Sequence, residues 1–126
     1  MESPLNITAV IPQLRTTDLA ASIDFYTRKL GFALEFRHQD FYAGIRAGAQ
    51  SFHLKQVCEP DPSIADVREG GHFHLYLRTD DAEAAAATVQ AKGVALVQDV
   101  HGTDWQTREF VIHDDQGHTL YFGQAL

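Results

Sequence analysis

Imidazole and phenol groups, which can bind ligands, move protons or hold a metal ion, are concentrated in three short segments of the chain. His72, His74 and Tyr76 are spaced two residues apart, so they would share one face of an extended strand. His53 and Tyr121 occupy similar positions in segments 51–55 and 119–123, where apolar residues alternate with polar ones. This pattern predicts a sheet with one apolar face under helices and a second face lined by rings. A face of this composition is typical of a binding surface.

Two halves of the chain carry the same order of signals and must position these side chains. The sequence at 15–18 recurs at 78–81, and each copy precedes a helical pattern. We expect the first helix to begin at Asp18 and end at Gly31, and the second to begin at Asp80 or Asp81 and end at Gly93. Hairpin turns are predicted at 47–49 and 115–117. The prediction is a single domain over 1–126, with module 1 at about 5–57, a linker at 58–70 and module 2 at about 71–126.

Composition and charge exclude several classes of protein. The 126 residues are 44% hydrophobic, which favours one globular domain with a real core. Ten Lys and Arg against 17 Asp and Glu give a formal net charge of -7, so we expect no nucleic-acid or membrane partner. Cys58 is the only cysteine, which rules out an internal disulfide and a cysteine-based zinc site. The first residues, Met1–Pro4, lack the features of an export signal, and a cytoplasmic location is expected.

Several motifs resemble those of the vicinal-oxygen-chelate superfamily, which includes glyoxalase I, bleomycin-resistance proteins and extradiol dioxygenases. They are Ile11–Arg15 with Asp18, Leu19 and Ser22; Phe25–Tyr26 with Leu30–Phe32; and Trp105–Phe110 followed by Asp114–His118. The last pair is most similar to the bleomycin-resistance branch. The resemblance implies an α+β fold of paired βαβββ modules, with mixed sheets curled around a cleft and helices on the outer face. It also implies a homodimer whose clefts are built by both subunits.

In metal-dependent members of this superfamily, four ligands line the cleft, and the resemblance places them at Ile11, His53, His74 and Tyr121. Ile11 has no donor atom, and a neutral phenol is a poor ligand without strong activation. We therefore expect no cofactor and no metal at these degenerate positions. A divalent metal bound through His53 and His74, completed by His72 or by a substrate, is left open. The other interpretation is that the two imidazoles hydrogen-bond a ligand or each other.

Aromatic side chains could form the walls of a ligand site. Trp105 could fill a gap in the core or stack on a flat ligand, and the resemblance favours the ligand wall. Tyr42 lies at the equivalent place in the first half and is predicted to form a second wall. Arg108 is counted among the ligand contacts, whereas Glu109 is expected to form an ion pair or a structural hydrogen bond.

The predicted function is that of a small-molecule-binding, drug-sequestering protein similar to bleomycin-resistance proteins. It would bind an aromatic compound, which could be cationic, in a dimer cleft. Its expected ligand contacts are Trp105, Tyr42, His53, His72, His74, Tyr76, Tyr121 and Arg108. One alternative is a metal-dependent lyase, isomerase or dioxygenase of the same superfamily. Another is a metal-free enzyme that uses His74 or Tyr121 as an acid or base, so whether the protein is an enzyme stays open.

Overall fold

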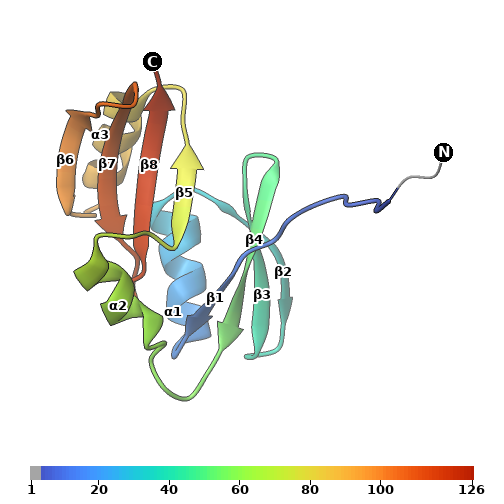
Figure 1. The fold of residues 1–126 in the computed structure, drawn as a ribbon. Coiled ribbons are helices and arrows are strands. Elements are labelled where there is room, and N and C mark those ends of the chain that lie inside the picture. The colour runs from blue at the N-terminus through green and yellow to red at the C-terminus, as the bar shows by residue number, and fades with distance from the viewer. Residues whose placement is uncertain (1–3) are drawn as a thin grey trace.

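A computed structural model describes residues 4–126 as two β-sheets of four strands, each with a helix on one side (Figure 1). The predicted α+β fold of paired βαβββ modules is confirmed. Residues 1–3, on which the expectation about an export signal partly depends, lie outside the described residues. None of the helices within 4–126 is long and apolar enough to cross a membrane.

Module 1 folds into sheet A, with strand order β1-β4-β3-β2. Its elements are β1 (Gln13–Thr16), α1 (Leu19–Asp24), the π-helical turn η1 (Phe25–Lys29), β2 (Ala33–His38), β3 (Tyr42–Ala47) and β4 (Gln50–Gln56). The helix begins where predicted, because the side chain of Asp18 accepts a hydrogen bond from the Ala21 N–H at 3.1 Å. Leu19, Ile23 and Tyr26 are buried against the sheet.

Module 2 repeats this order in sheet B, with strand order β5-β8-β7-β6. Its elements are β5 (Leu75–Arg78), α3 (Ala82–Ala91), β6 (Gln98–Gly102), β7 (Thr107–His113) and β8 (Thr119–Ala125). Asp81 caps α3 by accepting a hydrogen bond from the Ala84 N–H at 3.0 Å. The caps of α1 and α3 lie 63 residues apart, so the internal repeat seen in the sequence is a repeat of structure.

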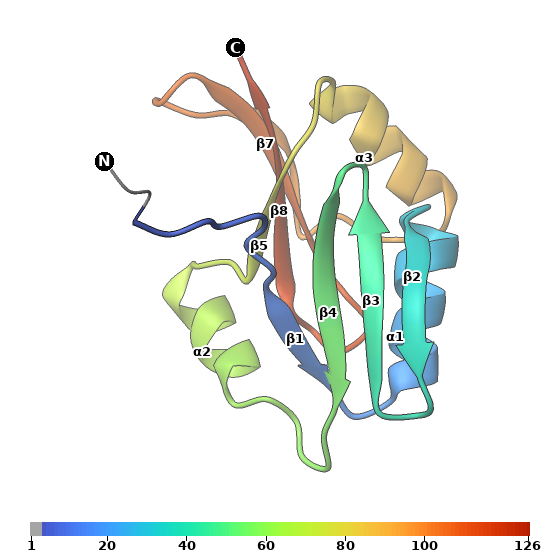
Figure 2. The ribbon, with the colours of Figure 1, turned by 90° about the vertical axis from the view of Figure 1, so that its right-hand side faces the viewer.

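Each sheet has a side packed on its own helix and an opposite side, here called its open face. Figure 1 shows the open face of sheet B with α3 behind it, and Figure 2 shows the open face of sheet A with α1 behind it. The helix sides of both sheets contribute to one apolar core, which includes Leu54 and Ile45 from sheet A and Phe110 and Leu120 from sheet B. The two open faces therefore point away from this shared core in different directions.

Two segments differ from what the sequence predicts. The linker at 58–70 contains helix α2 (Ser63–Gly70), which contacts β8 and ends at Gly71 with a φ of 72°. Before β1, residues 4–12 form an arm without regular structure that projects from the body (Figure 2). The arm exposes three apolar side chains, with Leu5 77%, Ile7 66% and Val10 84% accessible to solvent.

Candidate functional site

On the open face of sheet B, the ring of Tyr76 lies across a neighbouring strand. Tyr76 is on β5, and its hydroxyl donates a 2.6 Å hydrogen bond to Glu109 Oε2 on β7, two strands away. Between them on β8 is Gly123, the register partner of Glu109. A Cβ at position 123 would overlap the phenol, so the crossing requires glycine here.

Glu109 is the acceptor on which this face is organised. Its side chain is 3% exposed, and Oε2 also accepts hydrogen bonds from Thr107 Oγ1 at 3.0 Å and Trp105 Nε1 at 3.4 Å. Trp105 is 68% exposed, so its indole ring covers the carboxylate from the solvent side. The predicted structural hydrogen bond of Glu109 is confirmed. The sequence analysis did not recognise Glu109 as the residue that joins Trp105 to Tyr76.

Two further rings, which pack on Tyr76, complete what we call the module 2 ring cluster, defined as Phe73, Tyr76, Trp105 and Tyr121. The Phe73 centroid lies 5.6 Å from that of Tyr76 and 5.1 Å from that of Tyr121. The Tyr121 hydroxyl donates to the carbonyl oxygen of Gly71 at 3.3 Å. Phe73 is 47% exposed, so this face presents aromatic surface to solvent beside a buried carboxylate.

Sheet A has a smaller cluster built in the same way, the module 1 ring cluster of Phe36, Tyr42 and His53. Phe36 lies across Gly44, where a Cβ would overlap its ring, and meets the His53 ring at 5.3 Å. The Tyr42 hydroxyl lies 3.0 Å from His53 Nδ1 and accepts a 3.0 Å hydrogen bond from Gln13 Nε2. The structure thus brings together Tyr42 and His53, two of the predicted ligand contacts. No ring pair or hydrogen bond of residues 4–126 joins this cluster to that of module 2.

His74 is not part of either cluster, so the predicted alternation of side chains is wrong at this point. Strand β5 begins only at Leu75, and it is Phe73 that contacts Tyr76. His74 turns toward the other end of the sheet, where its Nδ1 accepts the Thr119 N–H at 3.1 Å. A neutral imidazole with Nδ1 as acceptor carries its proton on Nε2, which therefore donates to Ser63 Oγ at 3.1 Å. With both nitrogens engaged, His74 has no free atom for proton transfer or metal binding.

Beside His74, a buried carboxylate joins the two modules. Asp114, in the turn between β7 and β8, accepts the Tyr26 hydroxyl from η1 at 2.6 Å and His118 Nδ1–H at 2.7 Å, both on Oδ2. Its Oδ1 accepts the backbone N–H groups of Gln116 at 3.0 Å and His118 at 2.8 Å. Three other hydrogen bonds cross the same joint: Ser22 Oγ donates to Asp115, and both the N–H and Oγ1 of Thr17 donate to Gln116. The predicted hairpin turn is thus also the joint between modules.

Burial and hydrogen bonding shift the pKa of several groups at this joint. Burial alone would raise the pKa of Asp114, but hydrogen bonds from His118 and Tyr26 outweigh it and hold that pKa below its ordinary value. Burial, together with the charge of His118, lowers the pKa of His74. Burial and Asp114 raise the pKa of Tyr26, whose phenol therefore stays a donor. The pKa of Asp115 is raised, mainly by burial.

We expect the free energy of unfolding to fall as the pH is lowered from 7 to 5. The unfolded chain binds a proton at His74 near pH 6.5, whereas the folded chain resists it, so acid favours unfolding in that window. Asp114 adds a loss below about pH 4, as the pH falls through its depressed pKa. Asp115 has the opposite effect on the free energy of unfolding, because its pKa is raised and the folded chain therefore takes up this proton more readily than the unfolded chain. Urea unfolding at pH 7, 6 and 5 measures how the free energy of unfolding depends on pH. His74→Gln should make this dependence weaker, whereas His38→Gln, at an exposed position, should leave it unchanged.

The four positions predicted from the resemblance do not form a metal site. Ile11 offers no donor, and His74 uses both ring nitrogens. His53 Nδ1 lies against the Tyr42 hydroxyl in the module 1 cluster, whereas Tyr121 belongs to the module 2 cluster. Across residues 4–126, no three His, Cys, Asp or Glu side chains lie together so as to hold a metal ion. The donor set does not fit a divalent metal.

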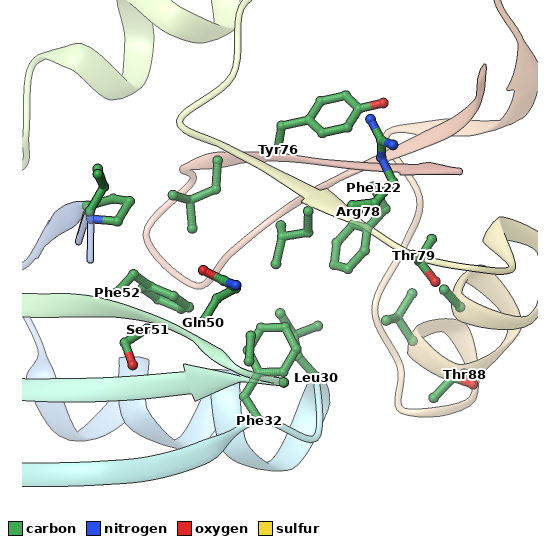
Figure 3. A pocket seen from close by; sticks show the side chains of 18 residues that line it. Leu30, Phe32, Gln50, Ser51, Phe52, Tyr76, Arg78, Thr79, Thr88 and Phe122 are labelled. Carbon is green, nitrogen blue, oxygen red and sulfur yellow. The ribbon is translucent and has the colours of Figure 1, made fainter. Parts of the chain in front are cut away.

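A pocket of about 700 Å³ opens between the modules, on the helix sides of the two sheets. Figure 3 shows Leu30, Phe32 and Phe52 of module 1 facing Phe122 of module 2 across it, with Tyr76 and Arg78 on the far side of β5. Of the residues predicted to contact a ligand, Tyr76 alone borders this pocket. It is a gap in the shared core, and Tyr76 is the one residue of the two ring clusters that lines it.

The remaining predicted contacts lie apart from the rings. His72 is exposed and packs over Gly70, where a Cβ would be 2.9 Å from its Nε2. Arg108 forms an ion pair with Glu83 of α3, on the helix side of sheet B, and thus points away from Glu109. The sequence did not predict that Phe36 and Phe73 belong to the ring clusters. It also did not predict the roles of Gly44 and Gly123, here called the crossing glycines because a ring lies over each of them. A glycine inside an alternating strand is nevertheless a recognisable signal that another group approaches the backbone closely.

Comparison with known proteins agrees with this architecture. The model of the glyoxalase/bleomycin resistance protein/dioxygenase superfamily matches residues 6–122. The chain belongs to this superfamily. A relative, an uncharacterized protein from Mycolicibacterium smegmatis, is 33% identical over 114 aligned residues. The alignment covers 90% of this chain and 90% of the relative. The predicted membership is confirmed.

Two solved structures of the superfamily show the same fold. A glyoxalase-related enzyme from Clostridium phytofermentans has a TM-score of 0.79 at 17% identity, covering 99% of this chain and 100% of its own. The bleomycin-binding protein from bleomycin-producing Streptomyces verticillus, solved with copper(II)-bleomycin, has a TM-score of 0.74 at 20% identity, covering 97% and 98%. The superfamily thus contains both an enzyme and a binding protein with this arrangement of elements, and the site must decide between them.

Proposed function

We propose that this protein binds an aromatic small molecule without chemical change and without a metal ion, as a drug-sequestering protein does. The observation that carries the proposal is the module 2 ring cluster. There the exposed indole of Trp105 and the phenol of Tyr76 contact a buried carboxylate, and the exposed phenyl ring of Phe73 packs on Tyr76 and Tyr121. Exposed aromatic surface loses contact with water when a flat compound stacks on it, and this is the main source of affinity in such sites.

The alternative enzymatic functions have less support. A metal-dependent lyase, isomerase or dioxygenase needs a donor set that residues 4–126 do not bring together. A metal-free enzyme based on His74 would need a ring nitrogen free to exchange a proton, and both nitrogens are engaged.

We also propose that the working form is a homodimer in which the open faces of two subunits enclose the ligand. Each open face leaves rings exposed, and within one chain the two ring clusters do not meet. The arm at residues 4–12 supports a second copy, because its exposed Leu5, Ile7 and Val10 would be covered by a partner.

Titration of the intrinsic fluorescence tests the proposal, because Trp105 is the only tryptophan. A panel of flat aromatic compounds, including copper(II)-bleomycin, should produce saturable quenching with at least one member. Calorimetry should then show that Trp105→Ala weakens binding of that compound by about tenfold or more, as expected for a central aromatic contact. Val97→Ala, which trims an exposed apolar side chain outside the ring clusters, should leave affinity unchanged.

Two results would contradict the proposal. One is the absence of any response across the panel. The other is turnover of a bound compound that disappears when metal is removed. Light scattering on the same samples gives the molar mass, and a mass of one chain at all concentrations would exclude the dimer.

A further inference from the structure

The carboxylate of Glu109 is buried with neutral partners only. All three of its hydrogen-bond donors, Tyr76, Thr107 and Trp105, are uncharged, and all three donate to Oε2. The pKa of Tyr76 is raised, by burial first and then by its bond to Glu109, so this phenol keeps its proton at neutral pH. Oε1 receives no hydrogen bond from the described part of the chain. Oε1 is not among the fully buried polar atoms that lack a partner, so it is the oxygen that water or a ligand can reach.

The cationic groups around Glu109 are directed elsewhere. Arg108, its neighbour in β7, pairs with Glu83 on the opposite side of the sheet. Arg78 lies over the Tyr76 ring, with its guanidinium carbon 5.9 Å from the centroid, and forms no ion pair with Glu109. His101, the register partner of Glu109 on β6, directs Nδ1 to the carbonyl oxygen of Asp99 at 2.8 Å. Among residues 4–126, Glu109 has no ion-pair partner.

A buried carboxylate without a cation is destabilised relative to one in water, and a positive group brought beside it offsets part of that destabilisation. The rings around Glu109 act in the same direction, because their faces attract cations. A ligand can approach Glu109 most easily at Trp105. The hydrogen bond from Trp105 to Glu109, at 3.4 Å, is the longest of the three, and Trp105 is the most exposed of the three donor residues. A ligand that stacks on the indole therefore brings its own charge close to Glu109.

We propose that Glu109 makes this site selective for cationic aromatic compounds, namely those with a protonated or alkylated nitrogen on or next to a flat ring. The inference rests on the proposed binding function and adds the charge of the ligand to it. Glu109 acts as the specificity determinant, whereas Trp105 supplies the stacking surface.

Two isosteric probes that differ in charge test the inference, N-methylquinolinium and neutral 1-methylnaphthalene. The indole N–H of Trp105 gives a single NMR resonance, whose shift reports binding of either probe to the intact protein. The wild-type protein should bind the cation about tenfold or more tighter than the neutral probe. Glu109→Gln should reduce this preference to within about threefold while leaving the affinity for 1-methylnaphthalene unchanged.

Controls separate charge from structure. Glu109→Asp, which keeps the charge, should retain the preference, as should Glu69→Gln, which removes a charge from exposed α2. Equal binding of both probes by the wild type overturns the inference even if Glu109→Gln fails to fold, and so does a preference that survives Glu109→Gln. In those cases the proposed function stands, since aromatic compounds still bind. If no member of the fluorescence panel binds either, the proposed function fails as well.

Discussion

Asp114→Ala is expected to lower the free energy of unfolding by about 3–5 kcal/mol, because it removes one member of a buried, hydrogen-bonded charge network. The substitution leaves the Tyr26 hydroxyl and the His118 imidazole without their acceptor in the core. The same change opens the joint between modules, since Tyr26 belongs to module 1 and His118 to module 2. Urea unfolding followed by circular dichroism at fixed protein concentration measures the loss.

Two variants distinguish this explanation from a general effect of losing an acidic residue. Tyr26→Phe deletes one donor only and should cost about 1–2 kcal/mol. Asp99→Ala, on exposed β6, should change stability by less than about 0.5 kcal/mol. A loss below about 1 kcal/mol for Asp114→Ala would show that the network does not hold the modules together.

Gly123→Ala should destabilise the protein by about 2–4 kcal/mol, although it adds a single methyl group. The new Cβ would occupy the space of the Tyr76 phenol, so the ring must leave the sheet. Glu109 then loses its shortest hydrogen bond and becomes more exposed to water. We expect the NMR resonance of the Trp105 indole to shift as well, because Trp105 shares the same carboxylate oxygen.

A double-mutant cycle isolates this contact. In a Tyr76→Ala background the overlap is absent, and Gly123→Ala should then cost less than about 0.5 kcal/mol. Gly102→Ala is the matched control, because Gly102 is also in a strand of sheet B and a methyl group added there would have no other atom within 4 Å. Equal costs for Gly123→Ala in both backgrounds would refute the crossing geometry.

The periodic parts of this fold could be predicted from the sequence. Both helix caps, both hairpin turns and the repeat depend on local signals, namely an Asp before an apolar helix face and Gly between alternating strands, and all are found where expected. Helix α2 was missed because its segment is rich in turn formers and has no buried residue to give a periodic signal.

The candidate site was only partly predictable, because it depends on contacts between distant strands. Strand alternation and the family motif indicate Tyr76, Tyr121 and Trp105, and the structure places Tyr76 beside Tyr121 and joins it to Trp105 through Glu109. His74 was misplaced because alternation holds only inside a strand, and β5 starts one residue after it. The sequence around Glu109 gives no sign that it joins Tyr76 to Trp105. Tyr76 reaches it through the register of the sheet, and Trp105 reaches it from the turn before β7.

Gly44 and Gly123 place one ring of each module on the side of the sheet away from the shared core. A ring that lies over a glycine rests on the outside of the sheet, so exchanging it does not disturb the side chains that face the helices. The two halves of the chain already differ in this way, with a phenyl group over Gly44 and a phenol over Gly123. Under the proposed binding function, single substitutions at positions 36 and 76 would change the ring presented to a ligand by one module independently of the other.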